Sequence, residues 1–231
     1  MKKVKGRYGY RRICYALRNE GVTINHKTVQ KFMVQMCLKA KRKKRHYRSY
    51  KGEVGKIAPN VIARDFDIYK PNKKWTTDVT QVNIGDAKMY LSPILDMYNG
   101  EIISYCISRS PNLEMATQML RSAFRKNKDL KGLILHSDQG WHYQHSTYQK
   151  MLKDKEIIQS MSRKGNCLDN AMMENFFGLM KNELLYINKF DSIEAFEKEL
   201  RKYIWWYNNK RIKLRLNGMS PVQYRAHANI N

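Results

Sequence analysis

Acidic residues are scarce in this 231-residue chain: 20 Asp and Glu stand against 44 Lys and Arg, for a formal net charge of +24. The excess is concentrated near the start, where residues 1–51 carry 17 basic residues and one acid, against 27 and 19 in residues 52–231. A strongly cationic chain attracts polyanions, because each neutralised phosphate releases condensed counterions. The composition therefore predicts a nucleic acid partner; the alternatives are a solvated basic tail and a ribosomal-type RNA binder.

Paired cysteines and long apolar runs are also missing. The four cysteines form no CxxC pair, which argues against a zinc ribbon and a disulfide scaffold and predicts a reducing, cytoplasmic setting. No apolar stretch approaches the ~20 residues that a membrane span requires, and no apolar signal segment follows the basic N-terminus. The GEVGK segment at 52–56 is too short for a phosphate-binding P-loop. These absences disfavour a membrane protein and an ATP-dependent enzyme.

Two short helices are predicted before residue 38. Their apolar faces at helical spacing are Tyr10, Ile13, Cys14 and Leu17, and then Val29, Phe32, Met33 and Met36. Asn25 is the predicted N-cap of the second helix. Such a pair is typical of a helix-turn-helix, whose second helix would offer Lys27, Gln30 and Lys31 to a DNA groove. The alternative is a helical hairpin whose charges face water. We assign residues 1–38 to a helix-turn-helix DNA-binding region.

A basic linker is predicted at 39–59, because KAKRKKRHYRSYK at 39–51 is too charged to fold alone. Its candidate phosphate contacts are Lys41, Arg42, Lys43, Lys44 and Arg45. A globular core follows at 60–190, and a helical extension at 191–231 completes the predicted domains. The aromatic segment of that extension, 203–207, is predicted to be core or subunit interface rather than a base-stacking surface.

Strand patterns dominate the start of the globular core. Stretches of β-forming residues at 75–84 and 88–97 flank a turn, and Asn99-Gly100, a hairpin signal, leads into a third strand at 101–110. Then come a helix at 112–126, a strand ending at Asp138, a helix at 145–154, a strand at 157–161 and a helix at 169–186. This order predicts an α/β fold with a mixed five-stranded sheet flanked by helices. It resembles the ribonuclease-H-like fold.

Three carboxylates are candidates for one site at the sheet edge. Asp78 lies in the first strand, Asp138 ends the fourth, and Glu174 follows Asp138 after 35 intervening residues, near the start of the last helix. Adjacent first and fourth strands would bring their acids together where ligands gather in α/β sheets. Three such acids repel one another unless divalent cations neutralise them, and hard oxygen ligands favour Mg²⁺ or Mn²⁺. Taken singly, each acid has another explanation: a bond to a neighbouring threonine, a turn, or an exposed helical acid.

The motifs around these acids resemble those of insertion-sequence transposases of the retroviral-integrase superfamily, the second-reading-frame type. The family's spacing is Asp, Asp, 35 residues, Glu. The supporting segments are WTTDVT at 75–80, HSDQG at 136–140, SRKGNCLDNAMMENFFGLMKNE at 162–183 and YNNKR…L…SPVQY at 207–224. The resemblance covers the chain from about Tyr8 to Tyr224. It implies an integrase core of ribonuclease-H-like fold and a DDE triad of Asp78, Asp138 and Glu174.

The resemblance also implies a reaction and its partners. Two Mg²⁺ or Mn²⁺ ions, held by the three acids, would support cleavage at the element's 3′ ends and strand transfer. Lys181, about two helical turns after Glu174, would contact DNA, as would Arg163 and Lys164. The partners implied are the terminal inverted repeats, target DNA, further copies of the chain and the product of an upstream reading frame. The setting would be the bacterial cytoplasm, on the nucleoid.

Two other functions stay open at this point. One is a catalytically silent DNA-binding regulator of its own element, which the three acids disfavour. The other is a ribonuclease-H-type nuclease, which the helix-turn-helix and the 35-residue interval disfavour. His142 stands where relatives commonly have glutamine, and the sequence assigns it no role. The histidines at 136, 142 and 145 form no zinc set with a nearby cysteine.

Overall fold

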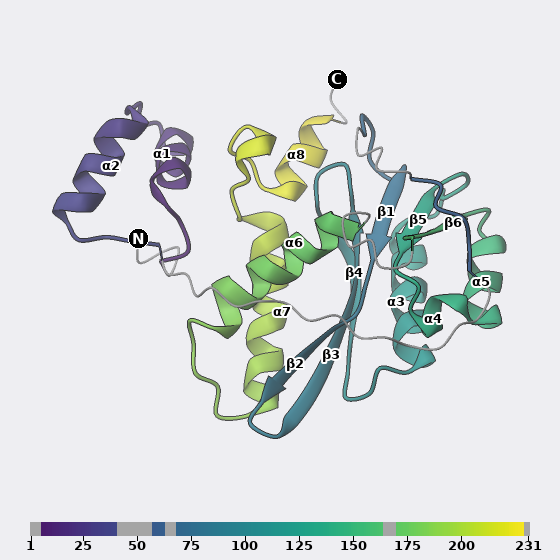
Figure 1. Ribbon diagram of the computed structural model, residues 1–231. Helices are drawn as coiled ribbons and strands as arrows, with labels where there is room; N and C mark the ends of the chain where they lie inside the picture. Colours follow the sequence, from purple (N-terminus) through teal and green to yellow (C-terminus); the bar gives the residue numbers. More distant parts are fainter. Residues whose placement is uncertain (1–5, 41–56, 63–67, 164–169, 229–231) are drawn as a thin grey trace. The chain divides into compact units, whose positions relative to one another are not determined.

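The structure, a computed structural model, describes residues 6–40, 57–62, 68–163 and 170–228 (Figure 1). The chain divides into two compact units. The sheet unit comprises Tyr47–Gly178 and Phe190–Lys198, and the helical unit comprises Met1–His46, Leu179–Lys189 and Glu199–Asn231. The predicted DNA contacts of the basic linker, Lys41, Arg42, Lys43, Lys44 and Arg45, lie outside the described residues, as does Lys164. No described helix is both long and apolar enough to cross a membrane.

The sheet has an antiparallel half. It contains β1 (Lys74–Thr77), β2 (Thr80–Ile84), β3 (Ala87–Asp96) and β4 (Ile102–Ser108). Both β1 and β2 pair with the same edge of β3 in one continuous register, from Trp75↔Asp96 to Ile84↔Ala87. The segment predicted as a single strand at 75–84 is therefore one strand interrupted at Asp78 and Val79. The interruption accounts for six strands in place of the predicted five.

The parallel half brings distant segments beside β1. The strand β5 (Ile134–Ser137) pairs parallel with β1, and β6 (Ile158–Met161) pairs parallel with β5. The β4 strand pairs with the other side of β3. The predicted adjacency of the first and fourth strands is thus confirmed, as is the mixed sheet flanked by helices. Parallel neighbours end at the same side of the sheet, so the residues that follow β1 and β5 are placed together.

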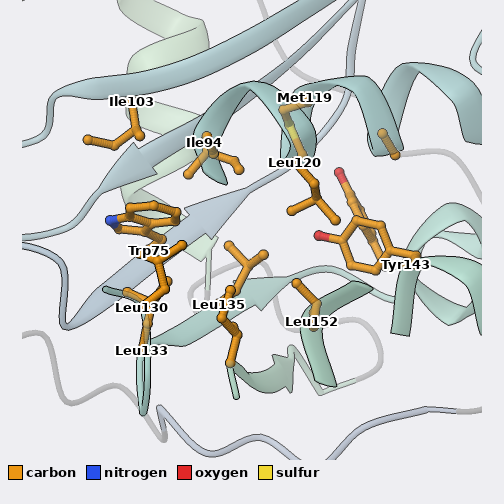
Figure 2. Packing of buried hydrophobic residues seen from close by; sticks show 14 of the residues in the cluster. Trp75, Ile94, Ile103, Met119, Leu120, Leu130, Leu133, Leu135, Tyr143 and Leu152 are labelled. Carbon is orange, nitrogen blue, oxygen red and sulfur yellow. The ribbon is translucent and has the colours of Figure 1, made fainter. Parts of the chain in front are cut away.

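A buried apolar cluster fixes the sheet against its helices (Figure 2). Trp75 on β1 and Leu135 on β5 are both almost fully buried. They pack with the apolar face of α3 (Leu113–Lys126), where Met119 and Leu120 have no exposed surface. Asn112 caps α3 by accepting a hydrogen bond from Met115 N at 3.0 Å. This packing holds the ends of β1 and β5 in place.

The hairpin between β3 and β4 gives Asp96, another acid at a strand end, a structural role. Asp96 is fully buried and accepts hydrogen bonds from Asn72 N at 2.9 Å and Tyr98 N at 3.0 Å. The turn predicted at Asn99-Gly100 is present, and Gly100 has a φ of 72°, a conformation that glycine adopts at little cost. Asp96 is a turn residue and lies apart from the carboxyl ends of β1 and β5.

Short helices follow the two parallel strands. After β5 come α4 (Trp141–Gln144) and α5 (Ser146–Lys153), and after β6 come α6 (Ala171–Met180) and the π-helix η3 (Lys181–Leu185). The predicted helix at 169–186 is therefore α-helical only as far as Met180. The chain continues through α7 (Ile193–Asn209), the 3₁₀ turn η4 (Leu214–Leu216) and α8 (Pro221–Ala228).

The N-terminal helices confirm the predicted pair, with one correction. They are α1 (Tyr10–Asn19) and α2 (His26–Gln35), and the Asn25 side chain caps α2 by accepting from Lys27 N at 2.9 Å. Val29 and Met33 are buried against Cys14. The prediction that Phe32 and Met36 share this buried face is wrong, because they are 48% and 60% exposed. Two ten-residue helices meet along a stripe too narrow to cover four apolar positions of α2.

The aromatic segment of α7 is likewise only partly core. Tyr203 and Tyr207 are buried at 2% exposure, as predicted, whereas Trp205 is 59% exposed. Trp206 packs against Tyr203 with ring centroids 5.7 Å apart. Helical spacing explains this difference in exposure. Residues three and four positions apart lie on one face of a helix, so residues 203, 206 and 207 share a face and residue 205 lies on another.

Candidate active site

Two carboxylates are brought side by side by the pairing of β1 with β5. The paired residues are Lys74↔Ile134, Trp75↔Leu135 and Thr76↔His136, each 60 positions apart. Asp78 and Asp138 are also 60 positions apart, and each follows the end of its strand. The register therefore carries these two acids to the same level, beyond the carboxyl ends of two adjacent parallel strands. This is where α/β sheets bind ligands.

The turn after β5 shapes the position of Asp138. Asp138 Oδ1 accepts a hydrogen bond from Gly140 N at 2.9 Å. A Cβ on Gly140 would lie 3.0 Å from that same oxygen and 3.3 Å from the ring of Tyr143. Glycine thus lets the carboxylate and the tyrosine ring both lie close to the backbone at residue 140. The turn expected as an alternative for DQG is present and serves to orient the acid.

A buried histidine network supports the same strand end. His136 has no exposed surface; its Nδ1 lies 2.9 Å from Ser160 Oγ and its Nε2 lies 3.1 Å from Ser162 Oγ. Ser162 Oγ donates to Ser137 O at 3.2 Å, and Gln139 Nε2 donates to Ser162 O at 3.0 Å. Polar groups so bonded are costly to displace. The network ties β5 to β6 directly before Asp138, so His136 positions the acid and is not a ligand.

The environment of the carboxylate pair shifts several pKa values. Burial raises the pKa of Asp138, while the Gly140 N–H and nearby His142 oppose the shift. Burial lowers the pKa of His142, whose Nε2 lies 2.9 Å from Pro111 O. Tyr143 is fully buried, and burial followed by the charges of Asp138 and Asp78 raises its pKa well above its ordinary value. The charges of both acids therefore act on one tyrosine, as expected if the two acids are neighbours.

Glu174 lies four residues, about one helical turn, after Asn170, which contacts the end of β1 directly. Asn170 is buried; its Nδ2 donates to Thr77 O at 3.3 Å, and Thr76 Oγ1 donates to its Oδ1. Residues four apart share a helix face, so Asn170 fixes the beginning of the helix that carries Glu174 against the residues just before Asp78. Burial raises the pKa of Glu174, which is half-buried.

The three acids are positioned by different elements of the fold. Among the residues that the structure describes, no group of three or more His, Cys, Asp and Glu is close enough to hold a metal ion. Asp78 and Asp138 follow the ends of two paired strands, whereas Glu174 is carried by the helix α6. The chemistry of Asp78 and Asp138 nevertheless fits a hard divalent cation, because adjacent carboxylates repel each other unless such an ion neutralises them.

The predicted DNA contacts occupy different parts of the molecule. Lys27, Gln30 and Lys31 are all exposed on α2, and Arg163 is exposed after β6. Lys181 begins η3 and is half-buried. Their contacts with DNA remain predictions.

Three residues of the site were missed by sequence reasoning. Asn170 and Tyr143 received no role, and His142 was noted without one. The Tyr143 hydroxyl is fully buried, next to Thr77 at the end of β1. For Asn170 a signal exists in the sequence, because an amide four residues before Glu174 shares its helix face. For Tyr143 no local signal separates a site residue from an ordinary core aromatic.

Comparison with known proteins identifies the family of the chain. The Integrase core domain profile matches residues 68–167, a second Integrase core domain profile matches 174–228, and an HTH-like domain profile matches 1–46. InsK of insertion sequence element IS150 from Escherichia coli K12 is 50% identical over 221 residues, covering 96% of this chain and 78% of that protein. The transposase for insertion sequence element IS904 from Lactococcus lactis is 35% identical, covering 96% and 89%.

Solved structures share the fold at low sequence identity. The HTLV-2 integrase catalytic core domain, solved in complex with magnesium, has a TM-score of 0.53 at 18% identity and covers 68% of this chain and 97% of its own. The simian T-cell lymphotropic virus intasome matches with a TM-score of 0.57 at 18% identity, covering 91% and 69%. The predicted ribonuclease-H-like integrase core is thereby confirmed. The chain belongs to the insertion-sequence transposases that carry an integrase core domain.

Proposed function

We propose that this transposase cleaves the 3′ ends of its insertion sequence and joins them to target DNA, with Asp78, Asp138 and Glu174 as catalytic acids. The observation that carries the proposal is the register of β1 and β5, which supports Asp78 and Asp138 as neighbours because each follows the end of its strand. The Asn170 contacts to Thr76 and Thr77 support Glu174 as the third member. Phosphoryl transfer needs positioning and charge stabilisation more than it needs a covalent enzyme intermediate.

The cofactor of this proposal is Mg²⁺ or Mn²⁺, two ions per site. Asp78 would contact both ions, Asp138 one and Glu174 the other. Bound ions of this kind activate an oxygen nucleophile and stabilise charge on the leaving oxygen. The chain's own part is to hold Asp138 by the Gly140 N–H and the His136 network, and to hold the start of α6 by Asn170.

The partners of the proposal are DNA and further copies of the chain. The helix-turn-helix would bind the terminal inverted repeats through Lys27, Gln30 and Lys31, and Arg163, Lys164 and Lys181 would lie along the reacting DNA. An intasome among the structural neighbours supports work as a nucleoprotein assembly. The product of an upstream reading frame is a further proposed partner, in the bacterial cytoplasm.

The reaction of purified protein with labelled element ends tests the proposal. We expect Mn²⁺ or Mg²⁺ to support joining of 3′ ends to a second duplex, and chelation by EDTA to stop it. Binding without cleavage would favour the silent regulator, and selective cutting of RNA in a hybrid would favour the nuclease. Either result would overturn the transposition reaction proposed for this site.

Asn170 offers a separate prediction about positioning. Changing Asn170→Ala removes both contacts to the end of β1, and second-sphere losses of this kind typically cost about 10- to 100-fold in activity or metal affinity. We expect joining to fall by that order and the cation concentration for half-maximal joining to rise. Asn83→Ala, an exposed amide on β2, is the matched control and should change neither. An unchanged cation requirement in Asn170→Ala would show that the amide serves folding alone.

A further inference from the structure

The first residues of the helical unit are anchored to its last ones. Tyr8 is 1% exposed, and its hydroxyl accepts from Ile212 N at 2.9 Å and lies 3.4 Å from Lys210 O. Arg7 Nε donates to Glu183 O at 2.9 Å, and its guanidinium carbon lies 4.5 Å from the ring centre of Trp206. Segments about two hundred positions apart in sequence thus share one core.

The helix α1 is anchored to the turn between η4 and α8. Asn19 Nδ2 donates to Gly218 O at 3.2 Å. Gly218 has a φ of 81°, and a Cβ built on it would lie 2.2 Å from Tyr15 Cδ1. That separation is far inside van der Waals contact, so only glycine permits this approach. The C-terminal segment is therefore a support for the first helix of the predicted helix-turn-helix.

Positive charge is concentrated in this unit. Its described residues contain 16 Lys and Arg against three acids, a balance of +13, whereas those of the sheet unit contain 15 against 13, a balance of +2. Two of the three acids are already paired, Glu183 with Arg211 and Glu199 with Lys202. Lys210 and Arg215, next to the segments that anchor Tyr8 and α1, are exposed. A surface with so few acids suits a phosphate backbone.

We propose that the C-terminal segment, residues 199–228, forms one duplex-DNA-binding surface together with α1 and α2. The family profile assigns this segment to the integrase core, whereas its contacts and charge place it with the N-terminal helices. The partner is the sugar-phosphate backbone of duplex DNA, contacted by Lys210 and Arg215, which lie in the segments that contact Tyr8 and α1. The inference rests on the proposed DNA-joining function but concerns binding and not chemistry.

Removing the two exposed charges tests the surface directly. In the full chain, the double variant Lys210→Ala and Arg215→Ala should weaken binding to a fluorescent random-sequence duplex. Its plot of log affinity against log salt should lose about 1.8 units of slope, two phosphate contacts at ~0.9 each. The matched control is Lys150→Ala with Lys153→Ala, which removes two exposed charges from α5 of the sheet unit. A wild-type slope in the first variant, or an equal loss in the control, would overturn the proposal.

Separating α1 from the C-terminal turn gives an independent test. Gly218→Ala places a methyl group inside the Tyr15 ring position and should lower duplex affinity. Gly132→Ala is the control, because Gly132 also has a positive φ, 73°, but nothing lies within 4 Å of its Cβ position. Undiminished affinity in Gly218→Ala would contradict the shared surface. If DNA affinity is unchanged in both sets of variants, this inference is wrong. The proposed reaction would still stand in that case, provided that joining still requires the three acids.

Discussion

Asp78→Asn is expected to lower strand joining by on the order of a thousandfold or more, since charge stabilisation by bound cations is worth several kcal/mol. Asparagine keeps the size of the side chain and an oxygen that can accept from Val79 N, as Asp78 Oδ1 does at 2.7 Å. It removes the negative charge that, beside Asp138, would hold a cation. Joining is measured with labelled ends in Mn²⁺, and duplex affinity in the same buffer.

The matched control for this variant is Asp86→Asn. Asp86 is an exposed acid in the turn between β2 and β3, so its replacement removes the same charge far from the paired strand ends. The control should join DNA at the wild-type rate, and both variants should bind duplex DNA as the wild type does. Retained joining in Asp78→Asn would exclude Asp78 as a catalytic acid.

The corresponding change at the third acid, Glu174→Gln, tests whether joining requires all three acids or only Asp78 and Asp138. Asp78 and Asp138 are placed by strand register, whereas Glu174 depends on a helix held through Asn170. If Glu174 completes the ligand set, Glu174→Gln should abolish joining as fully as Asp78→Asn while leaving DNA affinity intact. Joining that survives Glu174→Gln but not Asp78→Asn would assign the third ligand to another residue.

The sheet could be predicted from the sequence because its signals are local. Alternation in 75–84 and 88–97 and the Asn99-Gly100 turn specify hairpins between neighbouring segments. The break at Asp78 was not predicted, since Val79 and Thr80 continue a good strand pattern. Only the structure shows that β1 pairs with β5 and ends at Thr77, directly before Asp78.

Contacts between distant polar side chains could not be predicted. Asn170 bonds to residues 93 and 94 positions away, and Tyr8 bonds to one 204 positions away. Helical and strand periodicities report which side of an element is apolar, but not which distant element covers it. For the same reason Phe32 and Met36 were assigned to a buried face that no partner helix reaches. The three acids proposed as catalytic could be named from the sequence because the resemblance to the family supplies their spacing, and no contact had to be predicted.

A buried ion pair between Arg211 and Glu183 contributes to the stability of the helical unit. Arg211 is 1% exposed and binds Glu183 through two contacts, Nε to Oε2 at 2.8 Å and Nη2 to Oε1 at 2.5 Å. Tyr203 Oη donates to the same carboxylate at 2.9 Å. Burial alone lowers the pKa of Arg211, but its hydrogen bonds to Glu183 and that residue's charge reverse the shift. The pair thus joins η3, α7 and the segment after α7.

Arg211→Leu is therefore expected to destabilise the protein by about 3–5 kcal/mol, because it leaves the Glu183 carboxylate buried without its countercharge. Urea unfolding followed by tryptophan fluorescence measures the loss. The control, Arg109→Leu, removes an ion pair of similar length, 2.8 Å to Glu194, but exposed, and should cost at most about 1 kcal/mol. Adding Glu183→Leu to Arg211→Leu removes the stranded charge and should recover part of the stability. Equal losses in the two arginine variants would show that burial adds nothing to the contribution of this ion pair to stability.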